Sequence, residues 1–111
     1  MKQIRGDTAK YYFQRKDADG NVITTLPESL YFTVKKNYRV DEYLIHKTLA
    51  DMTFDDTDFS YHFTIEPKDT DDLKYGAYVC DIQVVQDGIK TTIFKDEFVL
   101  EEEVTFITNE D

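Results

Sequence analysis

Short acidic clusters are the residues of this 111-residue chain whose types and spacing come nearest to a chemical site. Calcium takes about six to eight oxygen ligands, often carboxylates at alternate positions of a loop. The segments DADGN (17–21), FDDTDF (54–59) and KDTDD (68–72) offer such carboxylates, and the candidate calcium ligands are Asp17, Asp19, Asp69 and Asp71. The same residue types also end strands and cap turns, and we expect this role, with no metal bound, at each loop.

The remaining reactive side chains give no pattern for catalysis. His46 and His62 are the only histidines, and no further zinc ligands are spaced around them. Cys80 lies on the apolar side of a predicted strand, which favours a buried thiol over a nucleophile. The tripeptide Arg5-Gly6-Asp7 matches an adhesion motif, but we expect it to break the first strand at Gly6. The sequence therefore predicts no enzyme, no catalytic residue and no cofactor.

The elements that position these residues are short strands. Apolar and polar residues alternate in LYFTVKK (30–36), FSYHFTI (59–65) and AYVCDIQV (77–84), which is typical of half-buried strands. The predicted inward sets are Leu30, Phe32 and Val34; Phe59, Tyr61, Phe63 and Ile65; and Tyr78, Cys80, Ile82 and Val84. Near the ends of the chain, Ala9, Tyr11 and Phe13 share one face, and Phe98, Leu100, Val104 and Phe106 share another, interrupted at Glu102 by a bulge or a strand switch.

Turn residues divide these strands at short intervals. DADGN predicts a hairpin turn, Asp87-Gly88 predicts a type I′ turn, and Pro67 with the following acids predicts a turn or one short helical turn. Seven to nine short strands indicate an all-β fold. Tyr78, two residues before Cys80, fits the tyrosine corner of an immunoglobulin-like antiparallel β-sandwich, although the second cysteine and the tryptophan of antibody domains are missing. We expect one such domain over residues 1–111, with another small Greek-key sandwich or barrel as the alternative.

Composition limits the partners. The chain has 23 acidic and 13 basic residues and a net charge of −10, which disfavours binding to nucleic acid and to anionic membranes. A single cysteine excludes an internal disulfide. The N-terminal segment lacks the apolar run of a signal peptide, and no stretch reaches membrane-spanning length, so we expect synthesis in a cytosol.

A surplus of aromatic residues is the last feature. By strand parity, the rings predicted on outer faces or in turns are those of Tyr12, Tyr31, Tyr38, Tyr75 and Phe94. Exposed rings stack on sugars or dock a protein partner. The other interpretation is that some parities are wrong, or that packing on both faces covers the rings.

The order of several segments adds a family resemblance. RGDT (5–8), DADGNVI (17–23), YFTVKKN (31–37), TIEPKDTDDLKYGAYVCDI (64–82) and EEVT (102–105) resemble small prophage-encoded proteins of Gram-positive bacteria. They resemble more distantly the N-terminal immunoglobulin-like domain of phage baseplate upper proteins. This resemblance implies an immunoglobulin-like sandwich with a structural or assembly role and no catalysis, and it makes the acids of PKDT turn residues.

We therefore expect a non-enzymatic structural or assembly protein of a phage or prophage, in its tail or baseplate. Its expected partners are other phage structural proteins or further copies of itself, and its expected location is the host bacterial cytoplasm and then the virion. The alternative is a carbohydrate-binding module that uses exposed tyrosines, with calcium in the acidic loops.

Overall fold

A computed structural model describes residues 1–103 of the chain. It contains eight strands, one α-helical turn and one 3₁₀ turn within those residues. The elements, in chain order, are β1 (Lys2–Ile4), β2 (Ala9–Gln14), β3 (Ser29–Lys35), β4 (Ile45–Thr48), η1 (Leu49–Asp51), β5 (Thr53–Asp55), β6 (Ser60–Ile65), α1 (Pro67–Thr70), β7 (Gly76–Gln86) and β8 (Ile89–Glu101). No helix of the described residues is long and apolar enough to cross a membrane.

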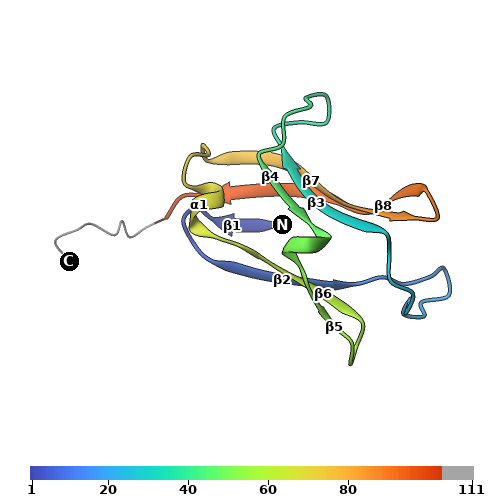
Figure 1. Cartoon of the computed structure of the whole chain (residues 1–111). Helices are drawn as coiled ribbons and strands as arrows, with labels where there is room; N and C mark the ends of the chain where they lie inside the picture. The colour runs from blue at the N-terminus through green and yellow to red at the C-terminus, as the bar shows by residue number, and fades with distance from the viewer. Residues whose placement is uncertain (104–111) are drawn as a thin grey trace.

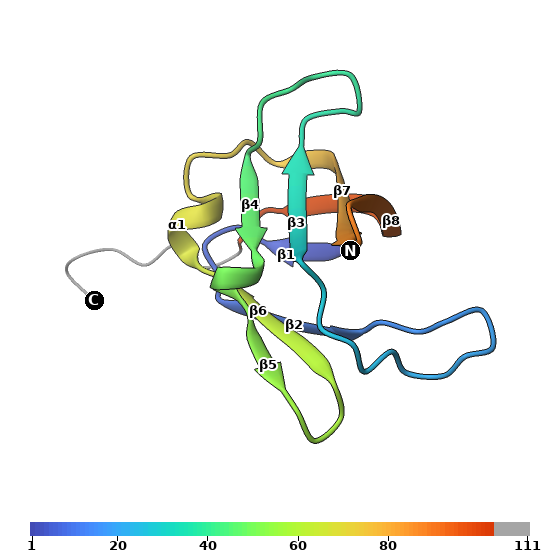
Figure 2. The same ribbon diagram turned by 45° about the vertical axis from the view of Figure 1, so that its right-hand side comes forward.

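The strands form two sheets that pack face to face. One sheet has the order β1-β8-β7-β3-β4 and the other has the order β2-β6-β5. All neighbouring strands are antiparallel except β1, which pairs in parallel with the end of β8. Figures 1 and 2 show the smaller sheet lying below the larger one, with α1 at one end. The predicted all-β sandwich is confirmed.

The core lies between the sheets and follows the predicted alternation. Leu30, Phe32 and Val34 from β3 are fully buried, and Phe63 of the facing sheet lies 4.6 Å from Phe32 between ring centroids. The other buried apolar residues are Ile45, Tyr61, Ile65, Cys80, Ile82, Val84, Phe98 and Leu100. Side chains two residues apart share a strand face, and the alternation in the sequence therefore predicted the buried face of β3, β6 and β7 correctly.

The predicted turns are also present. Asp87 and Gly88 have φ values of 54° and 75° between β7 and β8, as a type I′ hairpin requires. In DADGN, the Asp17 carboxylate accepts hydrogen bonds from the backbone N–H groups of Asp19 and Asn21, both at 2.9 Å. Pro67 begins the single helical turn α1. Turn chemistry therefore explains why these segments are acidic or rich in glycine.

Tyr78 makes the hydrogen bond that the tyrosine-corner prediction requires. Its phenol donates to the backbone carbonyl of Lys74, four residues upstream, and its ring packs against the core. This contact closes the turn between α1 and β7. The immunoglobulin-like topology itself stays a prediction.

One parity prediction is wrong. A β-bulge shifts the pairing of β7 with β8 between Ile82 and Gln83, so Phe94 lies opposite the buried Ile82 instead of opposite Asp81. Phe94 therefore points to the inner face of its sheet, although it was expected on the outer face. The interruption expected at Glu102 lies beyond the end of β8 at Glu101, and Val104 and Phe106 lie outside the described residues.

Candidate binding groove

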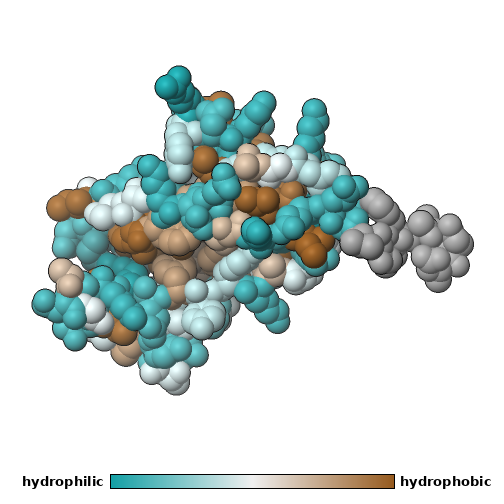
Figure 3. Space-filling view, turned by 180° about the vertical axis from the view of Figure 1, so that it is seen from behind, coloured by the Kyte–Doolittle hydropathy of each residue, from teal (hydrophilic) through white to brown (hydrophobic). Residues whose placement is uncertain are grey.

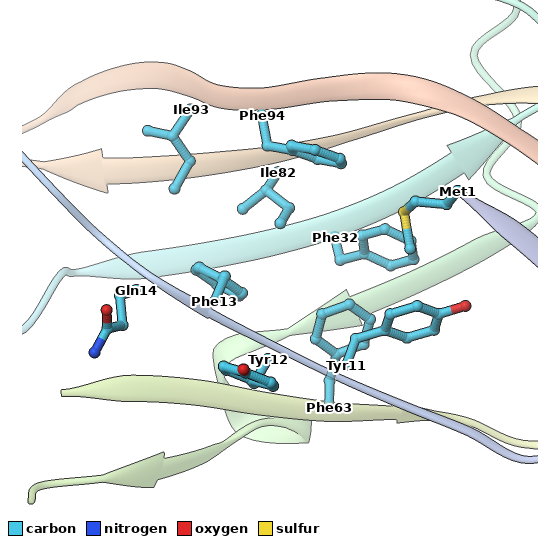
Figure 4. Close-up of a pocket in the computed structure, with 10 residues that line it drawn as sticks. All are labelled: Met1, Tyr11, Tyr12, Phe13, Gln14, Phe32, Phe63, Ile82, Ile93 and Phe94. Carbon is cyan, nitrogen blue, oxygen red and sulfur yellow. The ribbon is translucent and has the colours of Figure 1, made fainter. Parts of the chain in front are cut away.

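An apolar groove lies where the two sheets separate, between β2 and the first half of β8. Its central hollow has a volume of about 290 Å³. Phe13 and Tyr11 of β2 line one side, and Ile82, Ile93 and Phe94 of β7 and β8 line the other (Figure 4). Figure 3, which shows the molecule from behind the view of Figure 1, shows apolar side chains gathered in a hollow between hydrophilic rims.

The groove is open because neither strand beside it is paired on that side. Among the described residues, β2 pairs only with β6, and β8 pairs with β1 only over 99–101, while directly after β2 Lys16 bridges to Val22. Within residues 1–103, the edge of β2 and the edge of residues 89–96 therefore lack a strand partner. Unpaired strand edges carry free backbone N–H and C=O groups that add a further strand readily.

The opposite end of the same gap is closed. The phenol of Tyr11 donates a hydrogen bond to Gln3 Oε1 at 3.1 Å, which ties β2 to β1 across the two sheets. The N-terminal ammonium of Met1 lies 2.6 Å from Asp96 Oδ2, and this hydrogen bond lowers the pKa of the Asp96 carboxyl. The Tyr11–Gln3 hydrogen bond thus joins the two sheets at one end of the gap, and the Met1–Asp96 pair holds the start of β1 against β8 within the larger sheet.

A second hollow of about 450 Å³ continues the groove toward the loop end and is more polar. Arg15, Lys16 and Gln86 line it together with Ile23, Val84 and Ile93. The edge segments beside the groove, residues 9–16 and 89–96, contain five Lys or Arg residues and a single acid, Asp96. In a chain with net charge −10 this is a local reversal of charge.

The five aromatic candidates do not form one surface. Tyr12 is 71% exposed on the outer face of the smaller sheet, where it stacks on His62. Tyr31 lies on the outer face of the larger sheet, and Tyr38 lies near that face with Lys95 Nζ 4.4 Å from its ring centroid. Tyr75 lies before β7 and is covered by Arg5 at 4.3 Å. Phe94, which is 38% exposed, lies at the groove, and Tyr12 of β2 is the other candidate among the residues that line it (Figure 4).

A stack of three rings on the outer face of the larger sheet was not predicted from the sequence. The His46 ring lies between Tyr31 and Tyr43, with centroid distances of 5.5 Å and 4.5 Å. His46 Nδ1 also shares a hydrogen bond of 2.9 Å with Thr33 Oγ1. Because the rings face one another, they do not present a flat strip of the kind that stacks on a sugar.

Two of the four candidate calcium ligands accept hydrogen bonds from this protein's own groups, and the other two are exposed side chains. Asp17 caps its own turn, and Asp69 Oδ2 accepts hydrogen bonds from Glu66 N at 2.7 Å and Lys47 Nζ at 2.8 Å. Asp19 and Asp71 are exposed. Within residues 1–103, no three acidic, histidine or cysteine side chains come together as a metal site would require.

Two further predictions concern Cys80 and Arg5. Cys80 is 2% exposed, and burial raises the pKa of its thiol to about 11, so it is a core residue as predicted. β1 ends at Ile4, and Gly6, with a φ of 85°, lies in the turn that follows, so the tripeptide 5–7 breaks the strand as predicted. The Arg5 guanidinium donates to Glu103 Oε1 at 3.2 Å, so this side chain is already engaged.

No known family profile matches the sequence, and no curated protein matches it either. The fold and the groove together define the class of protein: an all-β sandwich with an apolar gap between two unpaired strand edges.

Proposed function

We propose that this chain is a non-enzymatic assembly module that binds another protein through the groove between β2 and β8. The observation that carries the proposal is the combination of an apolar hollow with two unpaired strand edges. Apolar surface and free backbone groups side by side favour addition of an extended polypeptide, since both are then removed from water.

The particle in which it assembles is inferred from the sequence resemblance. The segments 5–8, 17–23, 31–37 and 64–82 resemble small prophage proteins and the N-terminal domain of baseplate upper proteins. This supports an immunoglobulin-like structural component of a phage tail or baseplate. The acidic surface fits such a component, because net charge keeps a protein soluble until it meets its partner.

Sugar binding has less support from the geometry. Tyr12, Tyr38 and Tyr75 lie on separate parts of the surface, and each ring has His62, Lys95 or Arg5 against one face. A glycan array is the direct test of this alternative, and we expect no hits.

The test of the assembly role has two parts. Light scattering, with and without calcium, gives the size of the purified protein alone, and an antibody against it measures its copy number in phage particles purified from the producing bacterium. We expect a fixed copy number per particle and no effect of calcium. Absence from such particles, or turnover of a small molecule by the purified domain, would contradict the proposal.

A further inference from the structure

Within residues 1–103, Arg15 is a buried cation without an anionic partner. It follows β2 and is 6% exposed, and its side chain makes one hydrogen bond among these residues, from Nη1 to the backbone carbonyl of Thr25 at 2.8 Å. The ion pairs within residues 1–103 involve Met1, Arg5 and Lys47 instead. A guanidinium stays protonated in proteins, and a buried charge is normally paired because removing it from water is costly.

Gln86, which lines the same hollow, also lacks a partner in the part of the chain that the structure describes. Its Oε1 atom is buried and accepts no hydrogen bond from these residues. Buried acceptors in native proteins nearly always have a donor. Arg15 and Gln86 lie on facing sheets, so the polar end of the groove holds one unpaired cation and one unpaired acceptor.

The strand parity places Arg15 in line with the apolar part of the groove. Phe13 and Arg15 are two residues apart, so they project from the same face of β2 into the gap, about 7 Å from each other along the chain. The backbone carbonyl of Arg15 already accepts a hydrogen bond from the N–H of Ile23 at 2.7 Å, so the free edge that reaches the Arg15 hollow is that of residues 89–96 in β8. A strand added to this edge would place alternate side chains in the gap at the same interval. An apolar side chain beside Phe13 and Phe94 would then be followed, two residues along, by a side chain directed toward Arg15.

We propose that the groove binds an extended segment of another protein. In this segment every second side chain points into the groove and is apolar, and the last of these inward positions carries a carboxylate that pairs with Arg15. This inference rests on the assembly function proposed above and adds the chemistry of the partner segment: apolar residues at every second position, then Asp or Glu. The carboxylate neutralises the guanidinium.

The test uses capped synthetic peptides and the wild-type protein. The probes are TVTITFTE and its reverse ETFTITVT, because the direction of the added strand is open, and each is compared with the same peptide carrying Gln in place of Glu. Titration calorimetry measures the dissociation constants. In one direction we expect the Glu peptide to bind about 10- to 100-fold more tightly than the Gln peptide, as a hydrogen-bonded charge pair provides.

Two variants locate the effect. Arg15→Met removes the buried cation, and we expect it to abolish the preference for Glu while the melting temperature stays equal to that of the wild type or rises. Lys10→Met removes the same charge from the same strand, but Lys10 is exposed on the outer face of the smaller sheet. We expect Lys10→Met to keep the preference.

The outcomes separate this inference from the assembly function. Equal binding of Glu and Gln peptides, or no binding of either in both directions, overturns the inference, while a fixed copy number in phage particles would still support the assembly role. If Arg15→Met lowers the melting temperature and leaves the preference for Glu unchanged, Arg15 serves to hold the loop that contains Thr25, and the inference is again overturned. The wild-type protein could also form a dimer that Phe94→Glu dissociates and Tyr38→Glu does not. The groove would then hold a second copy of this chain, which would refute a separate partner.

Discussion

Thr70 gives the sharpest test of how the ends of the two sheets are held together. It is the last residue of α1 and is fully buried. Its Oγ1 accepts a hydrogen bond of 3.0 Å from the backbone N–H of Gly6, in the turn that leads from β1 to β2. The change we consider is Thr70→Val, which has almost the same shape and therefore leaves no cavity.

The cost of Thr70→Val is set by the partners that lose the hydroxyl. The Pro67 carbonyl loses a long contact of 3.4 Å but keeps the N–H of Asp71 at 3.0 Å. Gly6 itself is exposed, but its N–H points at the fully buried Thr70 side chain and is left facing a methyl group, and a donor left unsatisfied in this way costs about 1–3 kcal/mol. We therefore expect the free energy of unfolding to fall by about 1–3 kcal/mol, which lowers the melting temperature by roughly 4 °C or more.

Urea denaturation followed by circular dichroism is the assay, because the chain has no tryptophan for fluorescence. Thr70→Ser is the matched control: it keeps the hydroxyl and loses one methyl group, which costs about 0.8 kcal/mol. Valine should therefore destabilise more than serine, and the Gly6 amide should exchange faster in the valine variant alone. If serine costs more than valine, packing rather than this hydrogen bond holds the turn, and the reasoning is refuted.

Three further predictions concern other parts of the structure. The buried Cys80 thiol, with its pKa raised to about 11, should react with a thiol reagent near pH 8 at least about 100-fold more slowly than in urea, and fast labelling of the native protein would show that the site is open. The free energy of unfolding should also fall between about pH 9 and pH 11, because the thiol ionises at a lower pH in the unfolded chain than in the folded protein. Gly88→Ala should lower the free energy of unfolding by about 1–2 kcal/mol in urea titrations, because Gly88 has a φ of 75°, and an unchanged midpoint would argue against the type I′ turn. Millimolar calcium should leave the melting temperature unchanged, because Asp17 and Asp69 already accept hydrogen bonds within the protein; a rise would reveal a native-state ion site.

The sequence predicted the strands whose environment is simple. β3 and β6 cross the sandwich with one face on the core, so Phe32 and Phe63 follow a strict alternation that the sequence displays directly. The turn at Asp87 and Gly88 was equally clear, because a positive φ at both positions restricts the residue types.

The inward position of Phe94 and the burial of Arg15 were not predicted from the sequence. Counting back from the turn places Ile93 opposite Ile82, but the bulge puts Phe94 there, and alternation carries no sign of an extra residue. Arg15 follows a strand and precedes a turn, where a charged side chain is normally solvated. Its burial depends on the loop that contains Thr25, which only the tertiary structure brings against it. The groove was therefore not predictable from local patterns.

The pairing of β1 with β8 has a consequence for the way the chain folds. Lys2 and Gln3 lie beside Val99 and Leu100, so the first strand finds its place only against a strand made almost a full chain length later. A growing chain holds β1 without this partner until β8 has been made, and closing so long a loop slows folding. Final docking of β1, and with it the ion pair of Met1 with Asp96, is thus expected among the last events, after the remaining strands have collapsed.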